Sequence, residues 1–131
     1  MPRRQSKPRL DLARRIEENN KQLADYVQKL EQIKAEGKIA LPSCWIVRYQ
    51  SKGRGGTYWY YRWMSSDTIF VNSKGKPSSS KYIGKAGSKA YLDAVSMVAR
   101  RGQIEAIERA INTLSQGLED LVEEATRFTK K

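Results

Sequence analysis

The segment from Cys44 to Lys89 holds the side chains of this sequence that could do chemistry, and these are aromatic and basic. It reads CWIVRYQSKGRGGTYWYYRWMSSDTIFVNSKGKPSSSKYIGKAGSK and carries nine Lys or Arg against a single acid, Asp67. Aromatic and basic residues alternate along it, as in a half-buried strand whose successive side chains point to opposite faces. A surface so one-sidedly positive is typical of a protein that binds a polyanion.

The positive charge is concentrated rather than spread along the chain. The formal net charge is +11 over 131 residues. Residues 1–9 contribute four basic side chains and no acid, while residues 10–43 hold six of each. Residues 90–131 hold six basic and seven acidic side chains, as the solvated faces of helices usually do. A surplus restricted to the tail and the central segment favours a binding surface.

The chain lacks the residues on which several classes of function usually depend. The chain has no His and one cysteine, Cys44, so it lacks the commonest general base, a cysteine-based zinc site and an intrachain disulfide. The stretch GKAGSK lacks the spacing of a Walker A loop, so Gly84 and Gly87 are expected in turns. We therefore predict no enzyme, no metal and no cofactor. No apolar run reaches the roughly 20 residues of a membrane span, and no secretory signal is seen, so a cytoplasmic, nucleoid-associated protein is expected.

Two segments have the periodicity of helices. Over residues 9–37 a narrow apolar stripe recurs at helical spacing, interrupted at Asn20 and ended by Gly37. Over residues 88–129, Ser88 is a plausible N-cap, followed by the sheet-covering set Tyr91, Ala94, Val95 and Val98. From Ile104 to Phe128 apolar residues alternate spacings of three and four without a miss, which predicts a coiled-coil seam. The seam of this last helix is longer than the apolar stripe of the first helix. The part left uncovered predicts a homodimer or higher oligomer.

Between these helices the pattern predicts a small antiparallel sheet. Strands are expected at about 45–50, 57–64, 68–71 and 80–83. The face packed on the helix should carry Val47, Trp59, Tyr61, Trp63 and Ile83. The candidate nucleic-acid-binding residues are those of the opposite face and of the turns, with two arginines of the tail: Arg48, Tyr58, Tyr60, Arg62, Tyr82, Lys52, Arg54, Lys74, Lys76, Arg3 and Arg4.

The predicted fold class is therefore α+β. A sheet of three or four strands packs on a helix and is flanked by amino- and carboxy-terminal helices that form coiled coils. The predicted organisation is a basic disordered tail at 1–8, a helix at 9–37, a binding module at 44–101 and a coiled-coil helix at 102–131.

The stretch WYYRWMSSD, followed after an insert by SKYIGKAGSKAYLDAVSMVARRG, resembles the DNA-binding domain of plant AP2/ERF transcription factors. It is similar also to the arm-type domain of tyrosine recombinases. The shared features are a strand that ends in Tyr82, Ile83 and Gly84 and an alanine-rich helix after it. The resemblance covers about residues 45–101. It implies a sheet laid in the major groove with Arg62 and Tyr82 facing DNA, although Ser80 stands where a basic residue is common. The chain also looks like a group of small bacterial proteins, a resemblance that implies no function.

The sequence thus predicts a nucleic-acid-binding protein, with DNA as the favoured polymer and dimerisation through the helices. Such a protein would serve as a transcription regulator or as a nucleoid or recombination accessory factor. Exposed tyrosines that stack on unpaired bases would instead favour single strands or RNA. The alternative is a protein-interaction adaptor that uses its helices and the basic face of its sheet.

Overall fold

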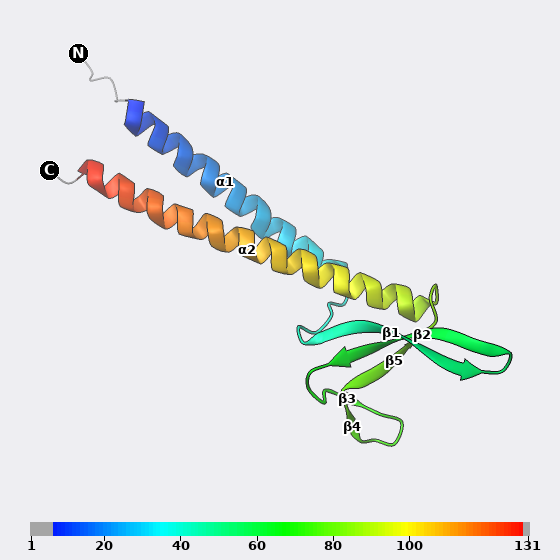
Figure 1. Ribbon diagram of the computed structural model, residues 1–131. Helices are drawn as coiled ribbons and strands as arrows, with labels where there is room; N and C mark the ends of the chain where they lie inside the picture. The colour runs from blue at the N-terminus through cyan, green and yellow to red at the C-terminus, as the bar shows by residue number, and fades with distance from the viewer. Residues whose placement is uncertain (1–6, 130–131) are drawn as a thin grey trace, which may run out of the picture. The chain divides into compact units, whose positions relative to one another are not determined.

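The computed structural model describes residues 7–129 and has the α+β class expected from the sequence. Its elements follow in the order α1 (Lys7–Glu36), β1 (Cys44–Gly53), β2 (Gly56–Ser65), β3 (Phe70–Val71), β4 (Pro77–Ser78), β5 (Ser80–Gly84) and α2 (Lys89–Thr129) (Figure 1). They form two compact units. The helix unit comprises residues 7–35 and 104–129, and the sheet unit comprises Glu36–Gln103. Among the described residues no helix is long and apolar enough to cross a membrane.

The helix unit is an antiparallel pair built from α1 and the second part of α2. Its buried apolar residues are Leu12 and Ile33 of α1 and Ile104 and Ile107 of α2. These residues belong to the two apolar stripes of the sequence, so the stripes cover each other as the helical periodicity requires. Polar contacts join the helices as well, because Arg15 forms an ion pair with Glu124 at 2.6 Å.

Asn19, and not Asn20, is the asparagine at the interface between the helices. Asn20 is exposed, whereas the half-buried Asn19 donates from Nδ2 to the carbonyl oxygen of Leu114 at 3.0 Å. Gly117 lies beside it, and a Cβ at Gly117 would stand 3.3 Å from Asn19 Oδ1. The glycine costs roughly 1 kcal/mol in a helix interior, and here it leaves room for this polar contact.

The main sheet has three strands in the order β1-β2-β5, all antiparallel. Strands β1 and β2 form a long hairpin that closes with Gly53 opposite Gly56, and Gly55 adopts a φ of 87° in the turn. The expected strand at 68–71 does not join this sheet. Its residues Phe70–Val71 pair instead with Pro77–Ser78 in a separate two-stranded sheet. Here the NSKGK turn makes a local hairpin with its own flanking residues.

One face of the main sheet packs on the first part of α2, and we call it the inner face. The rings of Tyr61 and Tyr91 meet at 4.7 Å between centroids, and Ile83 and Ala94 are buried. Val95 was expected in this contact, but it is 44% exposed and lies on another side of the helix. The inner face is thus covered by fewer helix residues than the sequence pattern predicts.

The turn from β5 into α2 depends on a close approach at Gly84. A Cβ at this position would lie 2.8 Å from Ser88 Oγ, and its φ of 154° disfavours other residues. Ser88 is the N-cap that the sequence predicts, because its Oγ accepts a hydrogen bond from the backbone N–H of Tyr91 at 3.2 Å. Strand and helix are therefore joined by a short turn of defined geometry.

Side chains of α2 fasten the segment that leads into β1. Arg101 Nη1 donates to the carbonyl oxygens of Leu41 and Cys44, the latter at 2.7 Å. The backbone N–H of Ala40 donates to the carbonyl oxygen of Met97 at 3.2 Å. These contacts place the start of β1 against the helix and so position the sheet.

Candidate nucleic-acid interface

The pairing register decides which side chains share the face opposite α2, which we call the outer face. Directly paired residues of antiparallel strands lie on the same face. Tyr49 pairs with Tyr60, Val47 with Arg62, and Arg62 with Tyr82 on its other side. With the alternate residues of each strand, the outer face is therefore composed of Trp45, Val47, Tyr49, Ser51, Tyr58, Tyr60, Arg62, Met64, Ser80 and Tyr82.

Three tyrosines of this face form a row across the sheet, one from each strand. The ring centroids of Tyr49 and Tyr60 lie 5.9 Å apart, and those of Tyr60 and Tyr82 lie 6.1 Å apart. The ring planes are tilted by 34° and 53°, so neighbouring rings do not stack flat on one another. Tyr82, on β5, is 59% exposed. We call Tyr49, Tyr60 and Tyr82 the tyrosine row.

Two cations lie against these aromatic rings. The guanidinium carbon of Arg62 is 4.7 Å from the ring centroid of Tyr49. The Nζ of Lys85 is 4.9 Å from the ring of Tyr58 and 5.7 Å from that of Tyr60. Contacts of this kind hold a cation over a ring by its quadrupole, without neutralising its charge. Arg62 Nε is buried and has no hydrogen-bond acceptor among the described residues.

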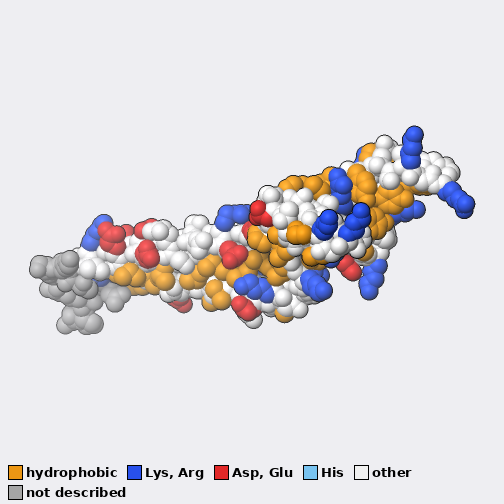
Figure 2. Space-filling view, turned by 90° about the horizontal axis from the view of Figure 1, so that it is seen from below, with side chains coloured by type: hydrophobic (Ala, Val, Ile, Leu, Met, Phe, Trp, Pro, Cys, Tyr) orange, Lys and Arg blue, Asp and Glu red, His pale blue; other side chains and the backbone are white. Residues whose placement is uncertain are grey.

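No carboxylate belongs to the outer face. Asp67, the one acid between Cys44 and Lys89, follows β2 in a loop, where its backbone N–H donates to Ser65 Oγ at 3.2 Å. Figure 2 shows Lys and Arg side chains gathered with apolar surface at the sheet end of the view. The positive charges of the outer face are therefore not neutralised by a carboxylate of the same face.

Arg48 was expected on this face, and the structure corrects that placement. It pairs with Tyr61 and so belongs to the inner face, whereas Val47 takes the outer position opposite Arg62. The Arg48 guanidinium lies 3.7 Å from the ring centroid of Trp59, which is itself 44% exposed. The predicted set of Tyr58, Tyr60, Arg62 and Tyr82 does share one face, and Arg48 stands apart from it.

The predicted basic residues of the turns fall into two places. Lys52 and Arg54 lie at the exposed tip of the β1–β2 hairpin, where the carbonyl of Arg54 accepts a hydrogen bond from Tyr58 Oη at 2.6 Å. Lys74 and Lys76 lie in the β3–β4 turn, and both backbone N–H groups donate to Asn72 Oδ1. Figure 1 shows these two turns well apart. Lys52 pairs with Thr57 and so belongs to the same face as Arg48, although it lies at the exposed end of the sheet, and the β3–β4 turn is apart from this hairpin tip.

Arg3 and Arg4 lie outside the described residues. Among the residues that make the ring and cation contacts of the outer face, Tyr49 and Lys85 were not predicted. Tyr49 follows from the hairpin register, since a two-residue turn at Arg54 and Gly55 places it opposite Tyr60. Lys85 follows β5 directly, and the sequence pattern alone does not bring it to Tyr58.

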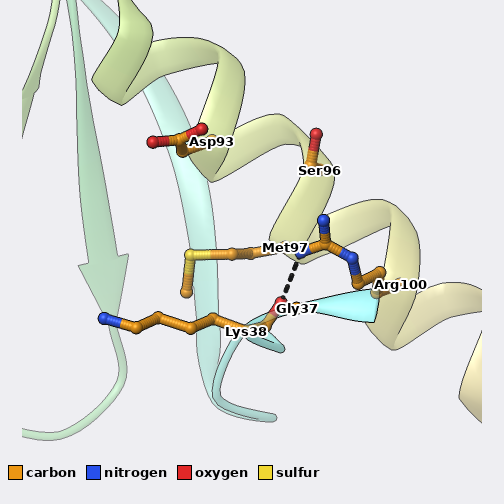
Figure 3. Close-up of a pocket in the computed structure, with 6 residues that line it drawn as sticks. All are labelled: Gly37, Lys38, Asp93, Ser96, Met97 and Arg100. Atoms are coloured by element: carbon orange, nitrogen blue, oxygen red, sulfur yellow. Dashed lines mark hydrogen bonds between the residues drawn. The ribbon is translucent and has the colours of Figure 1, made fainter. Parts of the chain in front are cut away.

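The hollows of the sheet unit include two that α2 helps to line. One of about 280 Å³ has a mixed polar and apolar lining, and Arg100 of this lining donates from Nη1 to the carbonyl oxygen of Lys38 at 2.8 Å (Figure 3). The other, of about 200 Å³, is largely apolar and includes Cys44, Trp63 and Lys81. Residues 7–129 contain no cluster of three or more His, Cys, Asp or Glu that could hold a metal ion.

Comparison of the chain with protein-family models, curated proteins and solved structures found no match.

Proposed function

We propose that this protein binds nucleic acid through the outer face of its three-stranded sheet. The observation that carries the proposal is the tyrosine row, with Arg62 and Lys85 against aromatic rings and no carboxylate on the same face. Nucleic acid offers both of the groups that such a face would contact, because its phosphates attract cations and its bases present flat aromatic surfaces.

The position of each cation in the interface suggests which group of the nucleic acid it would contact. Lys85, Lys52 and Arg54 are at the edge and the tip of the sheet and would contact phosphates, which give affinity independent of sequence. Arg62 stands within the sheet, where its planar guanidinium could bond to a base edge. The loose resemblance to sheet-based DNA-binding domains makes DNA the first polymer to test. A role as a transcription regulator, or as a nucleoid-associated or recombination accessory factor, would follow.

A second function is favoured by the helix unit. Leu10, Val27 and Val122 of the helix unit are exposed by 54%, 45% and 56%, and such apolar side chains gain free energy when a partner buries them. We propose that these residues contact a second copy of the chain, so that a dimer presents two sheets. The alternative is an adaptor whose helices bind another protein and whose basic sheet binds an acidic surface.

Salt dependence and a pair of arginine variants test nucleic-acid binding. Affinity for a labelled oligonucleotide, measured by fluorescence anisotropy, should fall steeply as salt rises, because cations are released from the phosphates. Arg62→Gln should weaken binding by roughly 1–3 kcal/mol, the range for a base-edge contact. Arg48→Gln, on the inner face of the neighbouring strand, is the matched control and should cost less. Absence of binding to any nucleic acid at low salt would rule the proposal out in favour of the adaptor.

A further inference from the structure

We infer that the outer face accepts an unpaired strand, with bases stacked on the tyrosine row, in preference to a duplex. This inference deepens the proposed function and rests on it. It names the class of nucleic acid that the face selects. The argument comes from the spacing of the rings, from the residue types around them and from the places of the two cations.

The spacing of the rings does not match a duplex. Successive centroids of the tyrosine row are 5.9 and 6.1 Å apart. Bases in a B-form duplex are about 3.4 Å apart along each strand. Consecutive bases could therefore lie on consecutive rings only if they separate from one another. An unpaired strand can extend in this way, whereas a duplex would have to unstack and lose its pairing.

The residue types of the outer face also fit stacking better than groove reading. A sheet that reads a duplex places Arg, Lys, Asn or Gln against base edges. Among the ten outer-face residues Arg62 is the single member of that group, and it is flanked by Tyr49 and Tyr82. Aromatic rings at the neighbouring positions would keep the sheet from entering the groove of a duplex and reaching the edges of its paired bases. They are instead the side chains on which unpaired bases stack, with little preference for sequence.

The cations lie where a strand crossing the sheet would need them. The tyrosine row runs from β1 through β2 to β5, so a strand that follows it crosses the sheet. Arg62 lies against Tyr49 at one end of the row, and Lys85 approaches Tyr60 at its middle. Lys85 can meet a phosphate, and Arg62 can bond to the edge of an unpaired base, while other bases occupy the rings. This arrangement joins stacking surface and charge along one path.

The test compares strands with duplexes. Binding of wild-type protein to labelled oligothymidylate and to a blunt duplex of equal length is measured by anisotropy at the same salt concentration. Oligouridylate is measured alongside, which separates RNA from DNA. We expect either single strand to bind more tightly than the duplex. This comparison decides the inference even if a variant fails to fold.

Variants of the row locate the contact. Tyr82 is exposed, so Tyr82→Leu should fold, and loss of one stacked base should weaken single-strand binding roughly 5- to 150-fold. Tyr82→Phe keeps the ring and should bind like wild type. Trp59→Leu removes an exposed aromatic from the inner face of β2 and should have little effect.

The failure of this inference can be told from the failure of the proposed function. If the duplex binds as tightly as the single strands, or if Tyr82→Leu binds like wild type, stacking on the row is overturned while nucleic-acid binding stands. If neither strands nor duplex bind, both proposals are overturned.

Discussion

Arg101 provides a test of how the sheet unit is held together. Its Nη1 donates to two backbone carbonyls that precede or begin β1, those of Leu41 and Cys44. Cys44 is buried and its bond to Arg101 is partly buried, whereas Leu41 is exposed. In Arg101→Met, water can replace the guanidinium at Leu41 but reaches the Cys44 carbonyl poorly. A hydrogen bond to a charged group contributes about 1.5–3 kcal/mol, and an unsatisfied buried carbonyl costs a similar amount.

We therefore expect Arg101→Met to lower the free energy of unfolding by about 2 kcal/mol, largely through Cys44. For a unit of this size that corresponds to a fall of roughly 8–16 °C in the unfolding midpoint. Tryptophan emission is the appropriate assay, since the three tryptophans, Trp45, Trp59 and Trp63, all lie in β1 and β2. Arg109→Met, at an exposed position of the same helix, is the control and should unfold like wild type. An unchanged midpoint for Arg101→Met would refute the reasoning.

Three further predictions concern the helices and the tail. Val122→Lys should abolish self-association in sedimentation experiments while circular dichroism stays helical; a monomeric wild type would contradict the proposed dimer. Hydrogen bonds from Arg14 and Arg15 hold the pKa of Asp11 below its usual 3.8. The stability that Asp11 contributes is thus present above pH 3.8 and lost as the pH falls through its lowered pKa. Asp11→Asn should reduce this acid sensitivity in a circular dichroism titration, and an unchanged titration would contradict the assignment. Deleting residues 1–6, which precede α1, should lower the salt slope of nucleic-acid binding by up to about two, one for each of Arg3 and Arg4, and leave the unfolding midpoint unchanged; a lower midpoint with unchanged binding would mean that the tail is structural.

The helices could be predicted closely from the sequence, because their apolar periodicity is long. The expected ranges 9–37 and 88–129 compare with Lys7–Glu36 and Lys89–Thr129 in the structure. The interface asparagine was misplaced by one position, from Asn19 to Asn20. A stripe of few residues defines the rotation of a helix about its axis only to within about one residue. One residue corresponds to roughly 100° of rotation. The contact between Asn19 and Leu114 resolves this rotation.

The main strands could be predicted as well. Alternation alone, however, does not tell which residues of one strand share a face with which residues of the next. Alternation divides each strand into two sets of residues, and a shift of one residue in register exchanges the sets. The first two strands were expected to end at Gln50 and to begin at Thr57, yet the ladder continues to Gly53 and Gly56. This two-residue turn pairs Arg48 with Tyr61, which removes Arg48 from the outer face. Recognition of the turn would have brought Tyr49 into the site.

The position of Lys85 in the site could not be predicted from the sequence pattern. Its position depends on the bulge between β2 and β5 at Tyr61 and Arg62, and on the turn at Gly84 that leads into α2. These are tertiary features, and neither has a periodic signal in the sequence. The separate β3–β4 hairpin is of the same kind, because its partner strand was not recognisable in the residues KPSS.

The most direct measurement is of the tyrosine ring signals by NMR as an unlabelled oligothymidylate is added. The chain has seven tyrosines, and they report on different surfaces. If nucleic acid binds the outer face, the ring signals of Tyr49, Tyr60 and Tyr82 should shift with the oligonucleotide concentration. Those of Tyr61 and Tyr91, which pack between sheet and helix, should stay nearly constant. Shifts confined to Tyr26 of α1, or no shifts at any tyrosine, would contradict the proposal that the outer face is the binding surface.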